Sequence, residues 1–188
     1  MKYDMSKKMT IGAKRVLDTF SRVMIQELSE KSFEDVTVGE LCEKAMYPRA
    51  TFYNYFDDKY DLFNYCLSLI LKRIAIYDYR QIANDRRLSV FFDRFYDIAE
   101  ENKDTIRSIL RNDINGLLVS SSLIQLNSII SELVKDCEYA GRYPVPCDLI
   151  AKHYSNTIML VIEHCFMKCD NCTKQQALYY LEYLLKDI

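Results

Sequence analysis

The sequence has little glycine or proline: 4 Gly and 3 Pro occur among 188 residues. Such a chain is typical of a helical globular protein and argues against disorder or a β-rich fold. No apolar run reaches the about 18 residues of a membrane-spanning helix. Near the N-terminus there is also no apolar core of roughly 7–15 residues, as a signal peptide would have. We therefore expect a cytoplasmic protein whose cysteines are free thiols.

Signs of catalysis are also missing. The chain has no glycine-rich phosphate loop, no evident carboxylate pair, and no nucleophile elbow around the serines at 120–122. The only histidines are His153 and His164. We therefore predict neither an enzyme nor a bound cofactor.

What the chain has is enough apolar residues for a core (49%) and an uneven charge distribution. The net charge of −2 does not indicate a nucleic-acid binder. Residues 1–26, however, contain six basic and two acidic side chains. A basic segment that precedes a polar helix is a modest electrostatic sign of DNA binding, although solvated lysines near a terminus would look the same.

Apolar residues recur at spacings of three and four, which predicts an all-α fold of about nine helices. The predicted helices are 11 to about 30, two short ones within 37–56, one from 57 or 58 to about 79, 88–101, one from 102 or 104 to near 112, 117–139, 147 to about 168, and a last one that follows Thr173. Residues 1–10 are predicted to be a basic arm, and 141–146 to be a loop.

The most informative stretch is residues 37–63. Thr37 is expected to cap a short helix, and Glu40 completes a capping box. Pro48 suits the first position of the next helix, so the bend falls at Met46 and the residue after it. Phe52, with a second phenylalanine four residues later, forms the inward face of that helix. Two short helices with a sharp turn suit the major groove of DNA.

The residues that point elsewhere are candidates for DNA contact, because Arg and Asn read base edges while hydroxyl groups bind phosphate. The candidates are Thr37, Val38, Pro48, Arg49, Ala50, Thr51, Tyr53, Asn54, Tyr55 and Lys59. Among them, Arg49 and Asn54 are the better candidates for base edges.

The order of residues adds a resemblance. Thr51 to Phe56, Lys59 and Asp61-Leu62-Phe63, preceded by Thr37, Val38, Leu41 and Ala45, closely resemble the TetR/AcrR family of one-component repressors. The resemblance is specific over the N-terminal third of the chain. It implies a DNA-binding domain at 1–57, a regulatory and dimerisation domain at 58–188, and phosphate contacts by Tyr53 and Lys59. It also implies a homodimer that an effector releases from a palindromic operator.

One departure from the family pattern falls at the turn. The family usually has Gly where this chain has Met46. A residue other than Gly at positive φ costs about 1 kcal/mol, so we expect a strained or slightly reshaped turn.

The helical body, residues 58–188, is expected to hold a small apolar or aromatic effector and, by resemblance, to pair its last two helices with those of a second copy. The pocket candidates are Tyr77, Phe95, Tyr96, Tyr139, Tyr154 and Ile158. The dimer candidates are Ile158, Val161, Ile162, Phe166, Leu178, Leu181 and Leu185. The alternative for both sets is that they only fill the core of one chain.

His164, Cys165, Cys169 and Cys172 form the pattern H-C-x3-C-x2-C. The last two cysteines have the spacing of zinc ligands, and a redox-sensing thiol is a second interpretation. We favour ordinary buried thiols and predict no metal. A thiol- or metal-sensing regulator therefore stays an alternative function, as does a TetR-like co-activator whose body binds a partner protein.

Overall fold

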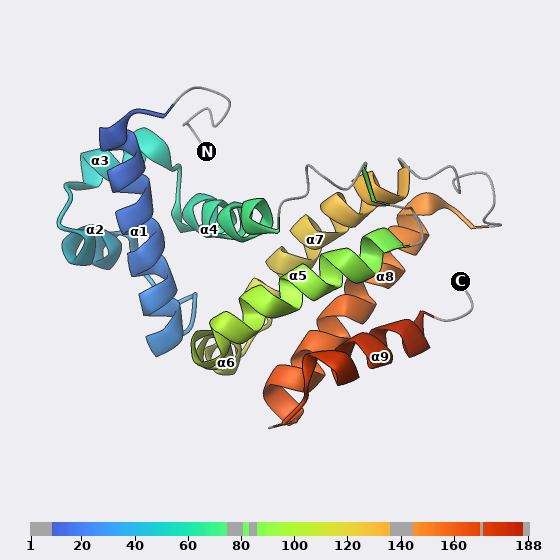
Figure 1. The fold of residues 1–188 in the computed structure, drawn as a ribbon. Coiled ribbons are helices and arrows are strands. Elements are labelled where there is room, and N and C mark those ends of the chain that lie inside the picture. The colour runs from blue at the N-terminus through green and yellow to red at the C-terminus, as the bar shows by residue number, and fades with distance from the viewer. Residues whose placement is uncertain (1–8, 75–80, 83–85, 136–144, 170, 186–188) are drawn as a thin grey trace. The chain divides into compact units, whose positions relative to one another are not determined.

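The computed structural model describes residues 9–74, 81–82, 86–135, 145–169 and 171–185. Over these residues the fold consists of helices and contains no strand, which confirms the all-α prediction (Figure 1). The nine α-helices in this part of the chain are α1 (Ile11–Glu30), α2 (Val38–Ala45), α3 (Arg49–Tyr55), α4 (Lys59–Arg73), α5 (Arg87–Glu101), α6 (Lys103–Asn112), α7 (Leu117–Lys135), α8 (Cys147–Glu163) and α9 (Lys174–Leu184).

Most predicted bounds agree with these helices to within two residues, and residues 136–139 of the helix predicted at 117–139 lie outside the described residues. The other differences are these. Pro48 is the N-cap of α3, so this helix begins one residue later than predicted. The helix predicted to reach Lys168 ends as α8 at Glu163, and the chain continues as the π-helix η4 (His164–Lys168). Helix α4 ends at Arg73, before the predicted end at residue 79. Residues 1–8 of the predicted arm and 141–144 of the predicted loop lie outside the described residues.

Grouping by spatial proximity divides the chain into two units. The first unit comprises residues 1–70 and 108–118, and the second comprises 71–107 and 119–188. The predicted domain boundary at 57/58 stays a prediction. The sequence did not indicate that 108–118, far along the chain, group with the N-terminal helices.

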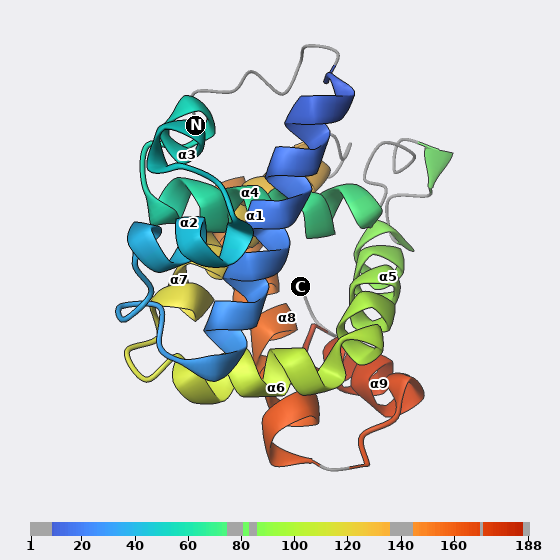
Figure 2. The same cartoon turned by 90° about the vertical axis from the view of Figure 1, so that its left-hand side faces the viewer.

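The core of the first unit is built around Phe20 of α1, which is fully buried. The ring of Phe52 lies edge-on to it at 5.3 Å, and those of Phe56 and Tyr47 follow at 6.3 and 5.7 Å between centroids. These aromatic contacts hold α2 and α3 against α1. Figure 2 shows the three helices lying beside one another. Because large apolar side chains pack this closely, α2 and α3 are held rigidly on α1.

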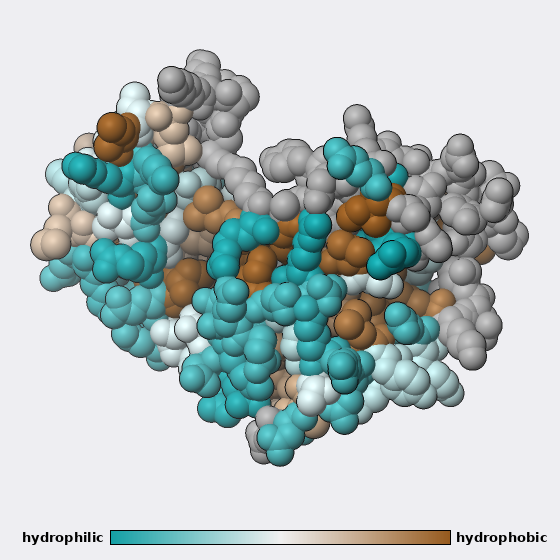
Figure 3. All heavy atoms as spheres, in the orientation of Figure 1, coloured by the Kyte–Doolittle hydropathy of each residue, from teal (hydrophilic) through white to brown (hydrophobic). Residues whose placement is uncertain are grey.

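In the second unit α9 packs against both α5 and α8. Lys174, at the start of α9, forms ion pairs with Asp93 and Asp97 of α5 at 2.7 and 2.8 Å. Figure 3 shows mainly hydrophilic residues over the outer face of α5.

No single helix among the described residues is long and apolar enough to cross a membrane. The consecutive segments Lys103–Asn112 and Leu117–Glu132 meet that test only together, with a bend of 118° between them.

Candidate nucleic-acid interface

The start of α2 is fixed by a capping box, as predicted. The Thr37 hydroxyl accepts a hydrogen bond from the Glu40 backbone N–H at 3.3 Å, and the Glu40 carboxylate accepts one from the Thr37 N–H at 3.0 Å. Lys31 also donates to this carboxylate at 2.9 Å. The hydrogen bonds from Lys31 and Thr37 lower the pKa of Glu40 to about 2. Glu40 is therefore ionised near neutral pH.

The turn after α2 has the positive φ that the family resemblance implied. Met46 has φ 56° and ψ 38°, in the left-handed region. Its N–H bonds to the carbonyl of Glu43 at 3.1 Å, and the N–H of Tyr47 bonds to that of Cys42 at 3.0 Å. This pair of bonds forms a Schellman motif, which usually has Gly at the position of Met46. The Met46 side chain is 88% exposed, so packing does little to offset the backbone strain.

Helix α3 has one buried face and one outward face, because Phe52 and the following Phe56 are both fully buried. Six of the ten candidate DNA contacts are exposed, and the other four are half-buried. The exposed ones are Thr37, Pro48, Arg49, Ala50, Tyr53 and Asn54, and the half-buried ones are Val38, Thr51, Tyr55 and Lys59. The fold thus brings nine of the ten candidates together around α2, the turn and α3, and it places Lys59 at the start of α4, in the same unit.

Arg49 reaches back from α3 toward the first turn of α2. A Cβ atom at Gly39 would lie 2.7 Å from Nη2 of Arg49 and 3.8 Å from the Thr37 hydroxyl oxygen. The absence of a side chain at Gly39 therefore leaves space for the guanidinium group. A cation beside the N-terminal turn of a helix, whose first N–H groups have no acceptor within the helix, suits a phosphate better than a base edge.

Lys59 makes contacts that the sequence did not predict. Its ammonium group donates to the carbonyls of Phe33, Glu34 and Val36 at 2.8, 2.9 and 2.9 Å. It also lies 4.8 Å from the centroid of the Phe33 ring. Burial lowers the pKa of Lys59. Because all three N–H groups of an ammonium are engaged, Lys59 here holds the loop between α1 and α2, and its predicted phosphate contact stays a prediction.

A charge network joins α1 to α2 behind this surface. Glu27 is only 1% exposed and contacts Lys31 at 3.2 Å and also Lys44 of α2. Lys44 in addition lies 3.4 Å from Glu30. A carboxylate this deeply buried is tolerable only with such partners, so the network helps to fix the position of α2 on α1.

Residues 112–118 complete the first unit, and sequence reasoning missed their role. The Asn112 amide donates to the Leu28 carbonyl at 3.1 Å, near the end of α1, and the Asn115 amide donates to Glu34 at 2.7 Å. Leu118 is buried in the same core as α1 to α3. The only sequence signal was the break between the helices predicted at 102–112 and 117–139, which gives no indication of its partners.

Four of the six residues predicted for an effector pocket lie in the part of the chain that the structure describes. Tyr77 and Tyr139 lie outside the described residues. Tyr96 and Ile158 are buried in the second unit, and Phe95 and Tyr154 are half-buried. Tyr96 contributes to a hollow of about 450 Å³ whose other lining residues are mostly polar or charged. The effector pocket stays a prediction.

Most of the predicted dimer contacts are buried within their own chain. Ile158, Val161, Ile162, Phe166 and Leu181 are all at most 4% exposed, and Leu178 and Leu185 are half-buried. A separate apolar hollow of about 320 Å³ lies between α8 and α9, lined by Leu160, Val161, His164, Tyr180, Tyr183 and Leu184. The exposed apolar surface around this hollow therefore consists mostly of residues other than those predicted.

The H-C-x3-C-x2-C pattern does not come together as a set of four ligands. His164 faces Tyr180, with 5.8 Å between ring centroids. Among the residues that the structure describes, no three His, Cys, Asp or Glu side chains are grouped so that they could hold a metal ion.

Comparison with known proteins agrees with the geometry of the first unit. Residues 25–66 match the family described as bacterial regulatory proteins, tetR family. This range runs from the middle of α1 through α2 and α3 into α4. The comparisons with curated proteins and with solved structures gave no match.

Proposed function

Residues 25–66 form a DNA-binding domain of the TetR family of bacterial regulatory proteins, and from this premise we propose that the chain is a homodimeric repressor. The match itself supports a DNA-binding transcriptional regulator of the TetR type. Members of this family are in general not enzymes. The proposed role requires the compartment that holds DNA, which in bacteria is the cytoplasm.

The observation that supports this proposal is the outward face of α3. Phe52 anchors one side of the helix in the core, which leaves Ala50, Tyr53 and Asn54 exposed on the other. In a helix-turn-helix the second helix enters the major groove with its N-terminal residues nearest the bases. Ala50 and Asn54 are then the candidates for base contacts, and Tyr53 for a phosphate.

A single short helix reads too few base pairs for a useful operator, so a second copy is required. A two-fold dimer presents two copies of α3 to successive major grooves, about 34–36 Å apart. The apolar hollow between α8 and α9 supports this step, because Leu160 and Leu184 at its rim are 54% and 46% exposed. We propose that these helices pair with the same helices of the second copy.

An effector would act by favouring a state of the dimer in which the two copies of α3 no longer match that spacing. A small apolar or aromatic molecule bound by the second unit is the proposed effector. Repression follows in this scheme from occupation of the operator and is relieved when the effector binds.

The test is a selection of DNA sequences from a random pool with the purified full-length protein. We expect a palindrome with half-sites about one helical turn apart. Binding to that site should fall steeply between about 50 and 200 mM salt, because phosphate contacts release counterions. A pool that shows no enrichment, together with salt-independent binding, would contradict the proposal and favour a body that recruits a partner protein.

A further inference from the structure

Two thiols lie together where η4 leads into α9, in the second unit. Cys165 of η4 is 2% exposed, and Cys172, just before the N-cap of α9, is 6% exposed. Both cysteines lie near Tyr96, whose ring lies 5.4 Å from that of Phe166 and whose hydroxyl binds the Cys172 carbonyl. Burial raises the pKa of Cys165, and the interaction with Cys172 also contributes to the raised pKa. The Cys172 thiol donates to the carbonyl of Thr173 at 3.7 Å. Both are free cysteines.

The backbone on each side of this pair is held in place. The Tyr96 hydroxyl donates to the carbonyl of Cys172 at 2.9 Å. Arg107 Nε donates to the carbonyl of Phe166, the residue after Cys165, at 2.7 Å. Thr173 starts α9 with a capping box. These contacts hold the backbone at both cysteines from three elements of the second unit.

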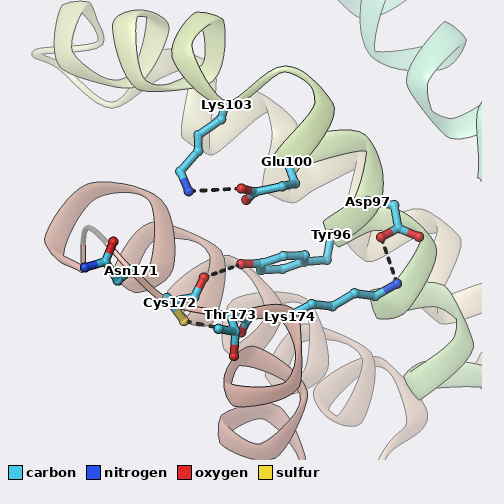
Figure 4. Close-up of a pocket in the computed structure, with 8 residues that line it drawn as sticks. All are labelled: Tyr96, Asp97, Glu100, Lys103, Asn171, Cys172, Thr173 and Lys174. Carbon is cyan, nitrogen blue, oxygen red and sulfur yellow. Dashed lines mark hydrogen bonds and ion pairs between the residues drawn. The ribbon is translucent and has the colours of Figure 1, made fainter.

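One of the two sulfurs has a route to solvent. Cys172 lines the hollow of about 450 Å³, together with Tyr96 and Asn171 (Figure 4). Two ammonium groups stand at the same hollow, but Lys103 is paired with Glu100 at 3.0 Å and Lys174 with acidic residues of α5. Cys165 is not part of the lining. A small oxidant that enters the hollow therefore meets Cys172 first.

We propose that Cys165 and Cys172 are a site of reversible oxidation, at which a hydroperoxide converts the two thiols into a disulfide. In the first step the Cys172 thiolate attacks one peroxide oxygen, so that an S–O bond forms and the O–O bond breaks. With hydrogen peroxide the departing hydroxide takes up a proton and leaves as water. In the second step the Cys165 sulfur attacks that of Cys172, the S–S bond forms, and the hydroxyl leaves with the Cys165 proton as a second water. Two electrons pass from the thiols to one peroxide.

The assignment of roles follows from burial. Desolvation raises the pKa of Cys165 to about 12, so this thiol stays protonated at neutral pH and is unsuited to the first attack. Cys165 also has to lose its proton in the second step, with the departing hydroxyl, so we expect the disulfide to form slowly after the sulfenic acid. Both lysines at the hollow are paired with carboxylates, so we expect oxidation to require excess peroxide.

The experiment is a thiol map of the reduced full-length protein before and after hydrogen peroxide, with iodoacetamide to block remaining thiols. We expect two of the 7 cysteines to become resistant to alkylation, with one cross-linked peptide that joins Cys165 to Cys172. Dithiothreitol should restore both. Cys165→Ala and Cys172→Ser should each abolish the cross-link, whereas the control Cys147→Ser, at a half-buried thiol outside the pair, should retain it.

The half-buried Cys169 is the other cysteine nearby that could form a disulfide with one of the pair. A cross-link that contains Cys169, or oxidation of Cys172 to sulfinic acid without any cross-link, would overturn the proposal. The wild-type peptide map alone separates these outcomes, so the result does not depend on how well the variants fold. It is also independent of DNA binding, because the readout is a chemical change in the second unit.

Discussion

At the scale of single residues, Arg49 bears on how α3 meets DNA. Its guanidinium group lies over the first turn of α2, in the space that Gly39 leaves. If it contacts a phosphate there, Arg49→Ala should weaken DNA binding by a similar factor on every sequence. It should also reduce the slope of log K against log salt by about 1. Binding of a panel of operator variants at several salt concentrations checks this. Relaxed specificity at one base position per half-site, with a cost of about 1–3 kcal/mol, would instead show base reading, as the sequence alone suggested.

Glu40 is the residue whose charge links the capping box to pH. Its pKa is about 2 in the folded protein, against an ordinary 4.5. Its contribution to stability is therefore full above about pH 4.5 and is lost as the pH falls toward 2. Glu40→Gln keeps a capping side chain, as Gln176 shows at the start of α9, but removes the charge. We expect the variant to be less stable at neutral pH and to lose stability less steeply between pH 4.5 and 2.

The measurement is urea unfolding at a series of pH values. Glu43→Gln removes a carboxylate from the same helix without touching the capping box, and it serves as the control. If the free energy of unfolding falls equally steeply with decreasing pH for the wild type and Glu40→Gln, the lowered pKa does not belong to this residue.

The backbone strain of the turn after α2 lies at Met46, because this residue has a positive φ. In the left-handed conformation a residue with a side chain is strained by about 1–2 kcal/mol, whereas Gly gains chain entropy in the unfolded state. The difference predicts that Met46→Gly stabilises the protein by up to about 1 kcal/mol in chemical denaturation. Met46→Ala keeps the strain and removes only an exposed side chain, so it should leave the stability nearly unchanged. A destabilised glycine variant would show that the turn is not strained.

At the scale of elements, α4 packs into the core of the first unit and is also joined to the loop between α1 and α2 by the side chain of Lys59. Lys59 donates to three carbonyls of the loop between α1 and α2. Lys59→Met keeps the apolar stem and leaves these carbonyls without their donor, so we expect a loss of about 2 kcal/mol in the free energy of unfolding. The slope of log K against log salt should stay unchanged if Lys59 only holds the loop. A slope lower by about 1 would show a phosphate contact as well.

The comparison of sequence with structure separates local from tertiary features. The capping box at Thr37 and the inward face of Phe52 depend on neighbours within a few residues, and the sequence predicted both. The positive φ at Met46 was implied by the family resemblance. The positions of Arg49 and Lys59 depend on contacts with other elements, and periodicity carries no information about them. The same holds for Asn112 and Asn115, whose partners lie more than eighty residues earlier.

At the scale of the whole molecule, the proposed dimer depends on which apolar residues of α8 and α9 meet a second copy. Ile158 and its predicted neighbours fill the core of their own chain, because a helix with a wide apolar face buries its most central residues first. Leu160 lies on the part of α8 that the chain's own core leaves uncovered, and it is 54% exposed beside the hollow. A carboxylate there would be buried without a partner in the dimer. Leu160→Glu should therefore yield a folded monomer.

Sedimentation equilibrium measures this directly, and Ile11→Glu is a suitable control, since Ile11 is equally apolar and 76% exposed but lies on α1. The wild type and the control should sediment as dimers. The monomeric variant should lose most of its affinity for a palindrome while it keeps the weak binding of one α3 helix to a half-site, because the second helix no longer adds its contacts at high effective concentration. A Leu160→Glu protein that remains a dimer would move the interface away from α8 and α9. Equal loss on half-site and palindrome would instead indicate that the substitution disturbs the first unit itself.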